Sequence, residues 1–317
     1  MRVLITGGAG FIGSHLTEAA LAAGHDVRVI DDFSTGTEEN LAGIRGHARF
    51  ALDRCDITTP EAADVLAAAC PEVVLHLAAQ ASVQSSLCSP LHDARTNVLG
   101  TLNILDAAAR CGTRKVVFAS SGGTVYGQAR ETDLPLTERL PKAPESFYGL
   151  SKHAGQEYLR LYSRLKGIEH ASLALGNVYG PRQDPHGEAG VVGIFTHRVL
   201  RGQTCTINGD GETTRDYVFV TDVVDAFLRA IDRGEGMINI GTGAETSVND
   251  VLRAVGRAAS VPDPAHRHDP ARPGEVRRIS LSPRRARREL DWTPEVPFAT
   301  GIAHLVAHLR QQPLPAG

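Results

Sequence analysis

The sequence predicts an α/β fold: a doubly wound parallel sheet with helices on both faces and a smaller lobe in the C-terminal half. Two observations lead to this prediction. In the first half of the 317-residue chain, short apolar runs alternate with longer segments of helical periodicity, as in right-handed strand–helix–strand crossovers. Aromatic residues make up only 5% of the chain and alanine is frequent, which favours helices packed closely on a sheet.

The expected strands are runs of four to six apolar or β-branched residues, which is typical of strands buried on both faces. In chain order they are residues 3–6, 27–31, 49–53, 73–77, 115–120 and 170–175. The helical patterns of the same half are residues 12–23, 61–69, 90–110 and 146–166. Crossovers of this kind place successive strands parallel in one sheet.

The alternation of strand and helix patterns ends after residue 175, where Gly180-Pro181 and Asp184-Pro185 mark long loops. Helical patterns resume at residues 191–200, 221–231, 248–259 and 299–310. We therefore expect residues 1–175 to form a sheet domain. Residues 176–317 should form mainly a smaller lobe over the carboxyl ends of the strands, where ligands bind in such sheets, with some segments returning to the first domain. The basic run 284–288 is interpreted as a solvated helix face.

Composition excludes several classes of protein. Hydrophobic residues are 42% and charged residues 22% of the chain, as in ordinary globular proteins. The net charge of −3 gives no basic field for nucleic acid or an anionic membrane, and no apolar run approaches the ~18 residues of a membrane span. The five cysteines are scattered without a C-x-x-C pair, and the chain opens on a strand-like segment without a signal peptide. We expect a soluble, cytoplasmic protein.

A glycine-rich turn follows the first expected strand and opens the first expected helix. Gly8, Gly10 and Gly13 match G-x-G-x-x-G in the strand–turn–helix context that makes this motif specific for dinucleotides. Glycine permits a close approach of backbone N–H groups to a pyrophosphate, and the helix N-terminus adds its positive dipole end. The second strand ends at Asp31, a carboxylate that can bind ribose hydroxyls and repel a 2′-phosphate. The sequence therefore predicts a Rossmann-type domain that binds NAD rather than NADP.

Tyr148 and Lys152 are one turn apart in the helical pattern 146–166, so their side chains share one face. A tyrosine with its ordinary pKa of ~10 is a poor base at neutral pH. An ammonium group one turn away, together with the positive nicotinamide ring of NAD⁺, would favour the phenolate and lower that pKa. Although most isolated Y-x-x-x-K matches are surface pairs, this one follows a dinucleotide motif and indicates proton transfer with a substrate hydroxyl.

Four segments together resemble the extended short-chain dehydrogenases. They are Gly7-x-x-Gly10-x-x-Gly13, the run 120–127 (SSGGTVYG), Tyr148-x-x-x-Lys152 and the run 177–182 (NVYGPR). The likeness extends over nearly the whole chain and is greatest to the nucleotide-sugar group, in particular the UDP-glucose and UDP-glucuronate 4-epimerases. It implies a homodimer with tightly held NAD that inverts C4 of a UDP-hexose through a 4-keto sugar, with Tyr148 as the base.

The resemblance also implies positions for the ligand contacts. The cofactor contacts would be Gly7, Gly10, Phe11, Ile12, Gly13, Asp31, Asp32, Asp56, Ile57, Ala78, Asn97, Ser120, Tyr148 and Lys152. Asp56 could instead be only a cap that ends its strand. On the substrate side, Asn177, Arg215 and Arg272 would meet the nucleotide diphosphate, since arginine donates paired hydrogen bonds to phosphate oxygens. Glu275 would hold the uridine ribose.

One departure from the family concerns the hydroxyl residue that shares the substrate O4 with the tyrosine. Its usual position is occupied by Gly122. Thr124 is therefore our first candidate for this catalytic, substrate-contacting hydroxyl, and Ser121 is our second. The pair Gly122-Gly123 also stands where 4,6-dehydratases have the Asp-Glu pair that catalyses elimination, which argues against a dehydratase.

Other departures concern the sugar pocket. Gly176 stands where the family often has an aromatic residue and is expected to enlarge the pocket, while Ile279 stands at an expected gating position. Arg182 either meets the C6 carboxylate of a glucuronate or only braces its loop. Asp184, His186 and Glu188 can all ligate metals, but the chemistry of the family needs no metal and we expect none.

Several functions stay open on the sequence alone, because one fold hosts many reactions. The leading hypothesis is C4 epimerisation of UDP-glucose and UDP-galactose, or of UDP-glucuronate and UDP-galacturonate. A UDP-glucuronate decarboxylase, or another nucleotide-sugar oxidoreductase of the family, is the alternative within enzymes. A non-catalytic NAD-binding regulator is the third hypothesis, and it would need neither Tyr148 nor Lys152. We expect no nucleic-acid or membrane partner.

Overall fold

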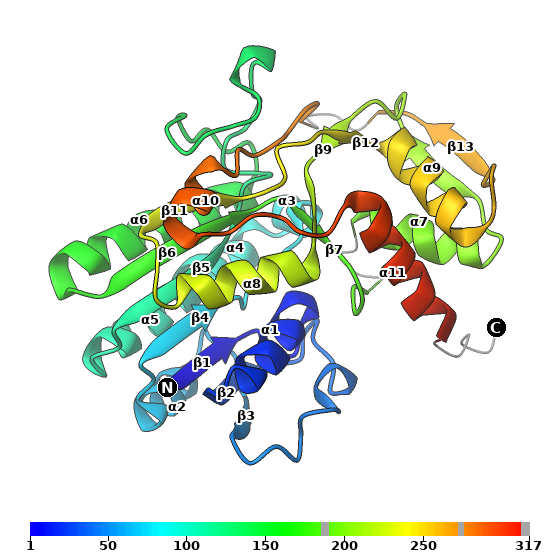
Figure 1. Cartoon of the computed structure of the whole chain (residues 1–317). Coiled ribbons are helices and arrows are strands. Elements are labelled where there is room, and N and C mark those ends of the chain that lie inside the picture. Colours follow the sequence, from blue (N-terminus) through cyan, green and yellow to red (C-terminus); the bar gives the residue numbers. More distant parts are fainter. Residues whose placement is uncertain (185–189, 272–275, 312–317) are drawn as a thin grey trace.

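The computed structural model describes residues 1–184, 190–271 and 276–311. Its centre is a seven-stranded parallel sheet in the order β11-β6-β5-β4-β1-β2-β3 (Figure 1). The strands are β1 (Arg2–Thr6), β2 (Asp26–Asp31), β3 (Phe50–Arg54), β4 (Val73–His76), β5 (Lys115–Ser121), β6 (Glu169–Leu175) and β11 (Gly236–Ile240). The six strands expected from the first half of the sequence are all present, and the predicted doubly wound α/β fold is confirmed.

Helices cover both faces of this sheet. One face packs against α1 (Phe11–Ala22), α8 (Val220–Ala230) and α10 (Arg284–Leu290). The other packs against α2 (Pro60–Ala69), α5 (Thr101–Arg110) and α6 (Phe147–Lys166). The neighbours Leu4 and Ile5 of β1 are both fully buried, each in the core of a different face. Because both faces are covered, the central strands β1, β4, β5 and β6 are buried along most of their length, whereas the edge strand β3 is only partly buried.

A smaller lobe lies at one end of the sheet (Figure 1). Its helices α7 (Val191–Leu200), α9 (Val248–Ala259) and α11 (Phe298–Gln311) share a separate apolar core. Short strands pair as β7 (Asn177–Tyr179) with β10 (Tyr217–Phe219), β8 (Cys205–Asn208) with β13 (His266–Asp269), and β9 (Thr214–Arg215) with β12 (Thr246–Ser247). In the described part of the chain, no helix is long and apolar enough to cross a membrane.

The C-terminal half also contributes to the main sheet. Strand β11 pairs with β6, with Ile238 opposite Leu173, and α8 and α10 pack on the face beside it. The sequence does not predict β11, because its short GMINI run contains glycine and asparagine, which are depleted in strands. The basic run 284–288 lies in α10, where Ala286 is buried and Arg284, Arg287 and Arg288 are exposed. This is the solvated helix face that was expected.

Two helical regions differ in detail from the prediction. The expected helix 90–110 consists of α4 (Pro90–Ala94), a π-helical segment η2 (Arg95–Gly100) and α5, and α3 (Val83–Cys88) precedes it. A π-helical turn shifts the hydrogen-bond register within a helix and is frequent at functional sites. Short 3₁₀ turns, η1 (Glu39–Leu41) and η3 (Glu131–Asp133), lie in the loops.

Candidate active site

The glycine turn between β1 and α1 has a backbone that only glycine fits. Gly7 has a φ of 72°, and a Cβ on it would lie 2.7 Å from the amide nitrogen of Ala78 after β4. A Cβ on Gly13 would overlap the carbonyl oxygen of Gly7. Gly10 is the extended residue that starts α1, so Phe11 and Ile12 form the first turn of that helix. The turn leaves room for backbone to approach a ligand at the helix N-terminus.

Asp31 lies directly beside this turn. It is 6% exposed, and its two carboxylate oxygens accept hydrogen bonds from the N–H groups of Ala9 and Phe33, each at 2.8 Å. Burial raises the pKa of its carboxyl above the ordinary value. A carboxylate has about four acceptor sites, so Asp31 can fix the glycine turn and still accept ribose hydroxyls. Asp32 is exposed and accepts from the N–H of Ser34.

The other predicted cofactor residues follow β3 and β4. Asp56 is exposed and accepts a hydrogen bond from the N–H of Thr58 in the turn before α2. Ile57 is buried against Gly100, and the N–H of Ala78 donates to the carbonyl of Thr6 at 3.0 Å. Because the carboxyl ends of parallel strands meet at one edge of a sheet, these residues gather beside the glycine turn.

Tyr148 and Lys152 lie on α6, whose first turn is capped by Ser146: its hydroxyl accepts from the N–H of Gly149 at 3.1 Å. Lys152 is 3% exposed, and its Nζ lies 5.8 Å from the ring centre of Tyr148 and 4.9 Å from that of Phe118. Burial lowers the pKa of Lys152 to about 8, and the negative charge of Asp93 opposes this shift. The ammonium is therefore a buried charge directly under the tyrosine.

A histidine that the sequence analysis did not consider lies next to this lysine. His76 of β4 is buried, and its Nδ1 and Nε2 are 2.6 Å and 3.0 Å from the hydroxyls of Thr6 and Thr101. The Thr6 hydroxyl already accepts backbone N–H groups, so it donates to Nδ1, and Nε2 carries the proton. Burial, with the nearby charge of Lys152, lowers the pKa of His76 to about 3. The sequence signal that could have identified His76 is a single histidine inside an apolar strand.

The hydroxyl candidates lie at the end of β5 and in the turn after it. The missing side chain at Gly122 does not leave an empty space, because a Cβ there would overlap the side chain of Leu281. The Oγ1 atom of Thr124 is buried and has no hydrogen-bond partner among the described residues. The carbonyl of Thr124 faces Gly149 in the first turn of α6, which places Thr124 next to Tyr148. Ser121 is half-buried in the same turn, while Ser120 is buried and accepts a 2.6 Å hydrogen bond from Gln156.

A cavity of about 280 Å³ brings together two of the predicted substrate residues, Asn177 and Arg215. Asn177 begins β7 directly after β6, and Arg215 ends β9, where its guanidinium donates to the carbonyl of Thr214. Tyr217, Phe195 and Val248 add apolar walls. Arg272 and Glu275, the other two predicted diphosphate and ribose contacts, lie outside the described residues.

Two expectations about the sugar pocket are wrong. Gly176 does not enlarge the pocket: a Cβ there would lie 2.8 Å from the carbonyl oxygen of Asp216, so backbone already fills that side. Ile279 is not a gate, because it is 1% exposed in an apolar cluster with Val125, Leu136 and Leu281. Of the residues considered for a metal, Asp184 is described and exposed, while His186 and Glu188 lie outside the described residues.

Arg182 makes its ion pair away from the cavity. One nitrogen of its guanidinium donates to the carboxylate of Glu18 on α1 at 2.7 Å. The carbonyl of the preceding Pro181 contacts the ring of His15, also on α1, at 3.0 Å. Nη1 of Arg182 is buried without a partner in the described parts of the chain. The loop that follows β7 is therefore fastened to the outer side of α1.

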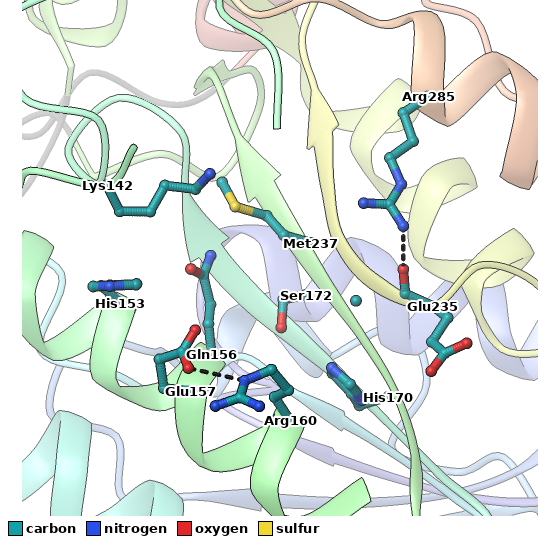
Figure 2. A pocket seen from close by; sticks show the side chains of 11 residues that line it. Lys142, His153, Gln156, Glu157, Arg160, His170, Ser172, Glu235, Met237 and Arg285 are labelled. Carbon is teal, nitrogen blue, oxygen red and sulfur yellow. Dashed lines mark hydrogen bonds and ion pairs between the residues drawn. The ribbon is translucent and has the colours of Figure 1, made fainter. Parts of the chain in front are cut away.

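A larger cavity of about 430 Å³ lies between α6, β6, β11 and α10, and the residues predicted for cofactor and substrate do not line it (Figure 2). Its walls include the buried His170 and Ser172, whose Nδ1 and Oγ have no hydrogen-bond partner among the described residues. Gln156 lines it too and donates to Ser120 at the end of β5.

Comparison with known proteins gives a consistent result. Residues 3–241 match the model of the NAD dependent epimerase/dehydratase family. A UDP-glucose 4-epimerase of Mycolicibacterium smegmatis is 47% identical over 314 residues, covering 98% of this chain and 99% of that protein. The structure of a Thermotoga maritima UDP-glucose 4-epimerase with UDP-glucose superposes with a TM-score of 0.94 at 40% identity, covering 98% and 99% of the two chains.

Two more matches bear on cofactor and reaction. A Thermus thermophilus UDP-glucose 4-epimerase in complex with NAD has a TM-score of 0.92 at 43% identity, with 98% and 99% of the chains covered. A UDP-glucuronic acid decarboxylase of Arabidopsis thaliana is more distant, at 33% identity over 95% of this chain and 87% of that protein.

Proposed function

Since the chain belongs to the NAD-dependent epimerase/dehydratase family, we propose that it is an NAD-dependent 4-epimerase that reversibly inverts C4 of a UDP-hexose, with UDP-glucose and UDP-galactose as its substrate pair. The observation that carries this proposal is the buried Lys152 under the ring of Tyr148, beside the hydroxyl of Thr124, which has no partner among the described residues. This is an arrangement for moving a proton to and from one substrate hydroxyl. The experiment that tests it is incubation with UDP-glucose, UDP-N-acetylglucosamine and UDP-glucuronate, followed by separation of the products.

The residues present fit NAD. The glycine turn, where a Cβ at Gly7 or Gly13 would collide with backbone, offers a cradle for a pyrophosphate at the start of α1. In our proposal Gly7, Gly10, Phe11, Ile12 and Gly13 hold the pyrophosphate. Further contacts come from Asp31 and Asp32 at the adenosine ribose, Asp56 and Ile57 near the adenine, and Ala78, Asn97, Ser120, Tyr148 and Lys152 along the rest of the cofactor. When bound, NAD reversibly accepts a hydride from C4 of the sugar.

Tyr148 as the phenolate takes the proton of the substrate O4, and Lys152 stabilises that phenolate with its positive charge. Thr124 donates or accepts the second hydrogen bond to O4, with Ser121 as the alternative. The 4-keto sugar then turns about its phosphate linkage, so that C4 would receive the hydride back on its opposite face while Tyr148 returns the proton to O4. Nothing is consumed overall, so the reaction needs no second redox substrate.

Asn177, Arg215, Arg272 and Glu275 hold the nucleotide in this proposal. Asn177 and Arg215 already share one cavity, and an arginine fork suits a diphosphate. Such a grip fixes the nucleotide while the sugar turns, so binding and chemistry are separated in space. We divide the chain accordingly into an NAD-binding domain, residues 1–175, and mainly a UDP-sugar lobe, residues 176–317, with α8, β11 and α10 belonging to the first domain.

Two features support a neutral hexose over a glucuronate. Arg182, the candidate for a carboxylate contact, is paired with Glu18, which compensates its charge. Gly176 provides no extra room beside the sugar, because the backbone of Asp216 occupies it. Formation of a UDP-pentose from UDP-glucuronate would instead favour the decarboxylase. Absence of turnover on every UDP- and dTDP-sugar would favour a non-catalytic regulator.

We also propose that the protein is a cytoplasmic homodimer. Leu91 of α4, Leu99 of η2, and Leu150 and Leu165 of α6 are 85%, 57%, 54% and 67% exposed, on helices that pack side by side. An apolar surface of this kind suits a helical interface between two copies. The five cysteines are all free thiols, as a reducing compartment requires. Light scattering at micromolar concentration should give the mass of a dimer, and the mass of a monomer would contradict the proposal.

A further inference from the structure

Asp93 is a fully buried carboxylate that the mechanism above does not use. It lies on α4, and three donors face its oxygens: the hydroxyl of Ser151 at 2.6 Å, and the amide groups of Asn97 and Gln80 at 2.9 Å each. A buried carboxylate with this many donors is in the environment that its anion needs. The arrangement is therefore built to keep a negative charge inside the protein.

The three donors come from separate parts of the candidate active site. Ser151 is the residue before Lys152 on α6. Asn97 belongs to the π-helical segment η2. Its amide oxygen accepts from the backbone N–H of Gln80, and its amide nitrogen donates to the carbonyl of Gln80, each at 2.9 Å. Gln80 lies two residues after Ala78, in the loop that follows β4. Asp93 thus joins α6, η2 and this loop at one point.

We propose that Asp93 is a positioning residue that supplies the counter-charge for Lys152 and locks the loop after β4 against α6. This inference rests on the proposed function, because it concerns how the Tyr148–Lys152 pair is held in its charged state. A buried ammonium without a compensating anion is costly and tends to lose its proton. Asp93 makes the positive charge of Lys152 sustainable in a dry site.

The other groups around Lys152 do not provide this charge. From β5 it meets the ring of Phe118, and from its own helix the ring of Tyr148. From β4 it meets His76, which is kept neutral by burial and by Lys152 itself. The anion that favours the charged form of Lys152 is Asp93 on α4, and it counteracts the burial that lowers the lysine pKa.

The test is Asp93→Asn, which removes the charge and keeps the size, with Ser151→Ala as the matched control. The control deletes one hydrogen bond to Asp93 but leaves its charge in place. In Asp93→Asn the Tyr148–Lys152 pair should titrate at lower pH, because loss of a nearby anion disfavours every protonated or positive state. A shift of about one unit is expected for a close charge. Ser151→Ala should move the profile of kcat/KM against pH much less than Asp93→Asn does.

Two readouts keep the outcome clear. The first is the pH profile of kcat/KM. The second is the tyrosinate absorbance titration of the NAD-loaded protein, taken as the difference from the same protein with Tyr148→Phe, and it needs no turnover. The titration therefore tests the role of Asp93 even if the proposed substrate is wrong. Asp93→Ser is measured beside Asp93→Asn, so that poor folding of one variant does not remove the test. Unshifted titrations in a folded charge-removing variant would overturn the proposal.

Discussion

Thr124→Val separates the catalytic use of a hydroxyl from its structural cost. Valine has the shape of threonine with a methyl group in place of the hydroxyl. In the structure the Thr124 hydroxyl is buried and has no hydrogen-bond partner in the described ranges. An unpartnered buried polar group costs about 1–3 kcal/mol of stability. The substitution should therefore leave the free energy of unfolding unchanged or raise it by about that amount.

Activity should change in the opposite direction. If Thr124 shares the substrate O4 with Tyr148, its hydroxyl contributes a hydrogen bond to a group that gains charge, worth about 1.5–3 kcal/mol. This corresponds to a loss of about 10- to 150-fold in kcat/KM. Product formation from UDP-glucose and thermal unfolding would be measured on the same preparations.

Ser121→Ala is the matched control, since Ser121 is the alternative hydroxyl. It lies in the same turn and is less buried than a core residue. We expect a small effect on rate. Wild-type activity of the Thr124→Val variant, or a larger loss in Ser121→Ala, would refute the assignment and transfer the role to Ser121.

Three further predictions concern the same site. Tyr148→Phe should lower turnover by about 10²–10⁴-fold, the usual contribution of a positioned acid–base group, while NAD stays bound; a rate near wild type would exclude Tyr148 as the base. Lys152 should lose its proton above its pKa of about 8, so the wild-type rate should fall on the alkaline side. Lys152→Met should lower the rate and move the pH–rate profile to higher pH, because the pKa of Tyr148 would be higher. An unmoved profile would argue against this coupling. Arg182→Ala should cost at most about 1 kcal/mol of stability, as a partly exposed ion pair does, and reduce kcat/KM equally for UDP-glucose and UDP-glucuronate; a selective loss on UDP-glucuronate would restore the carboxylate contact.

The main sheet could be predicted from sequence because its strands are buried on both faces. Most strands of the first half are mainly apolar runs, although β2 and β3 also carry charged residues. Most crossovers contain a helix, whereas the connection from β2 to β3 has only the 3₁₀ turn η1. Strand β11 escaped prediction because it is short, carries glycine and asparagine, and joins the sheet only through pairing with β6. The small strand pairs of the lobe are two to four residues long, too short for periodicity to appear.

The candidate site likewise contains residues that the sequence predicts and residues that it does not. Gly7, Gly13, Tyr148 and Lys152 could be proposed from the sequence because their spacing along the chain reflects local geometry. The supporting groups His76 and Asp93 depend on contacts between elements far apart in sequence, and a single buried polar residue in an apolar segment gives little signal. Gly176 illustrates the converse error. The missing side chain suggested open space, but the tertiary structure brings the backbone of Asp216 against it.

The central claim is that C4 of a UDP-hexose is inverted with the hydride returned to the same carbon. Its most direct test is to incubate the purified protein, without added NAD, with UDP-glucose that carries deuterium at C4, and to analyse the products by mass spectrometry and NMR. The account predicts UDP-galactose that retains the deuterium at C4, with no net NADH. Unchanged UDP-glucose, or UDP-galactose that has lost the deuterium, would contradict it.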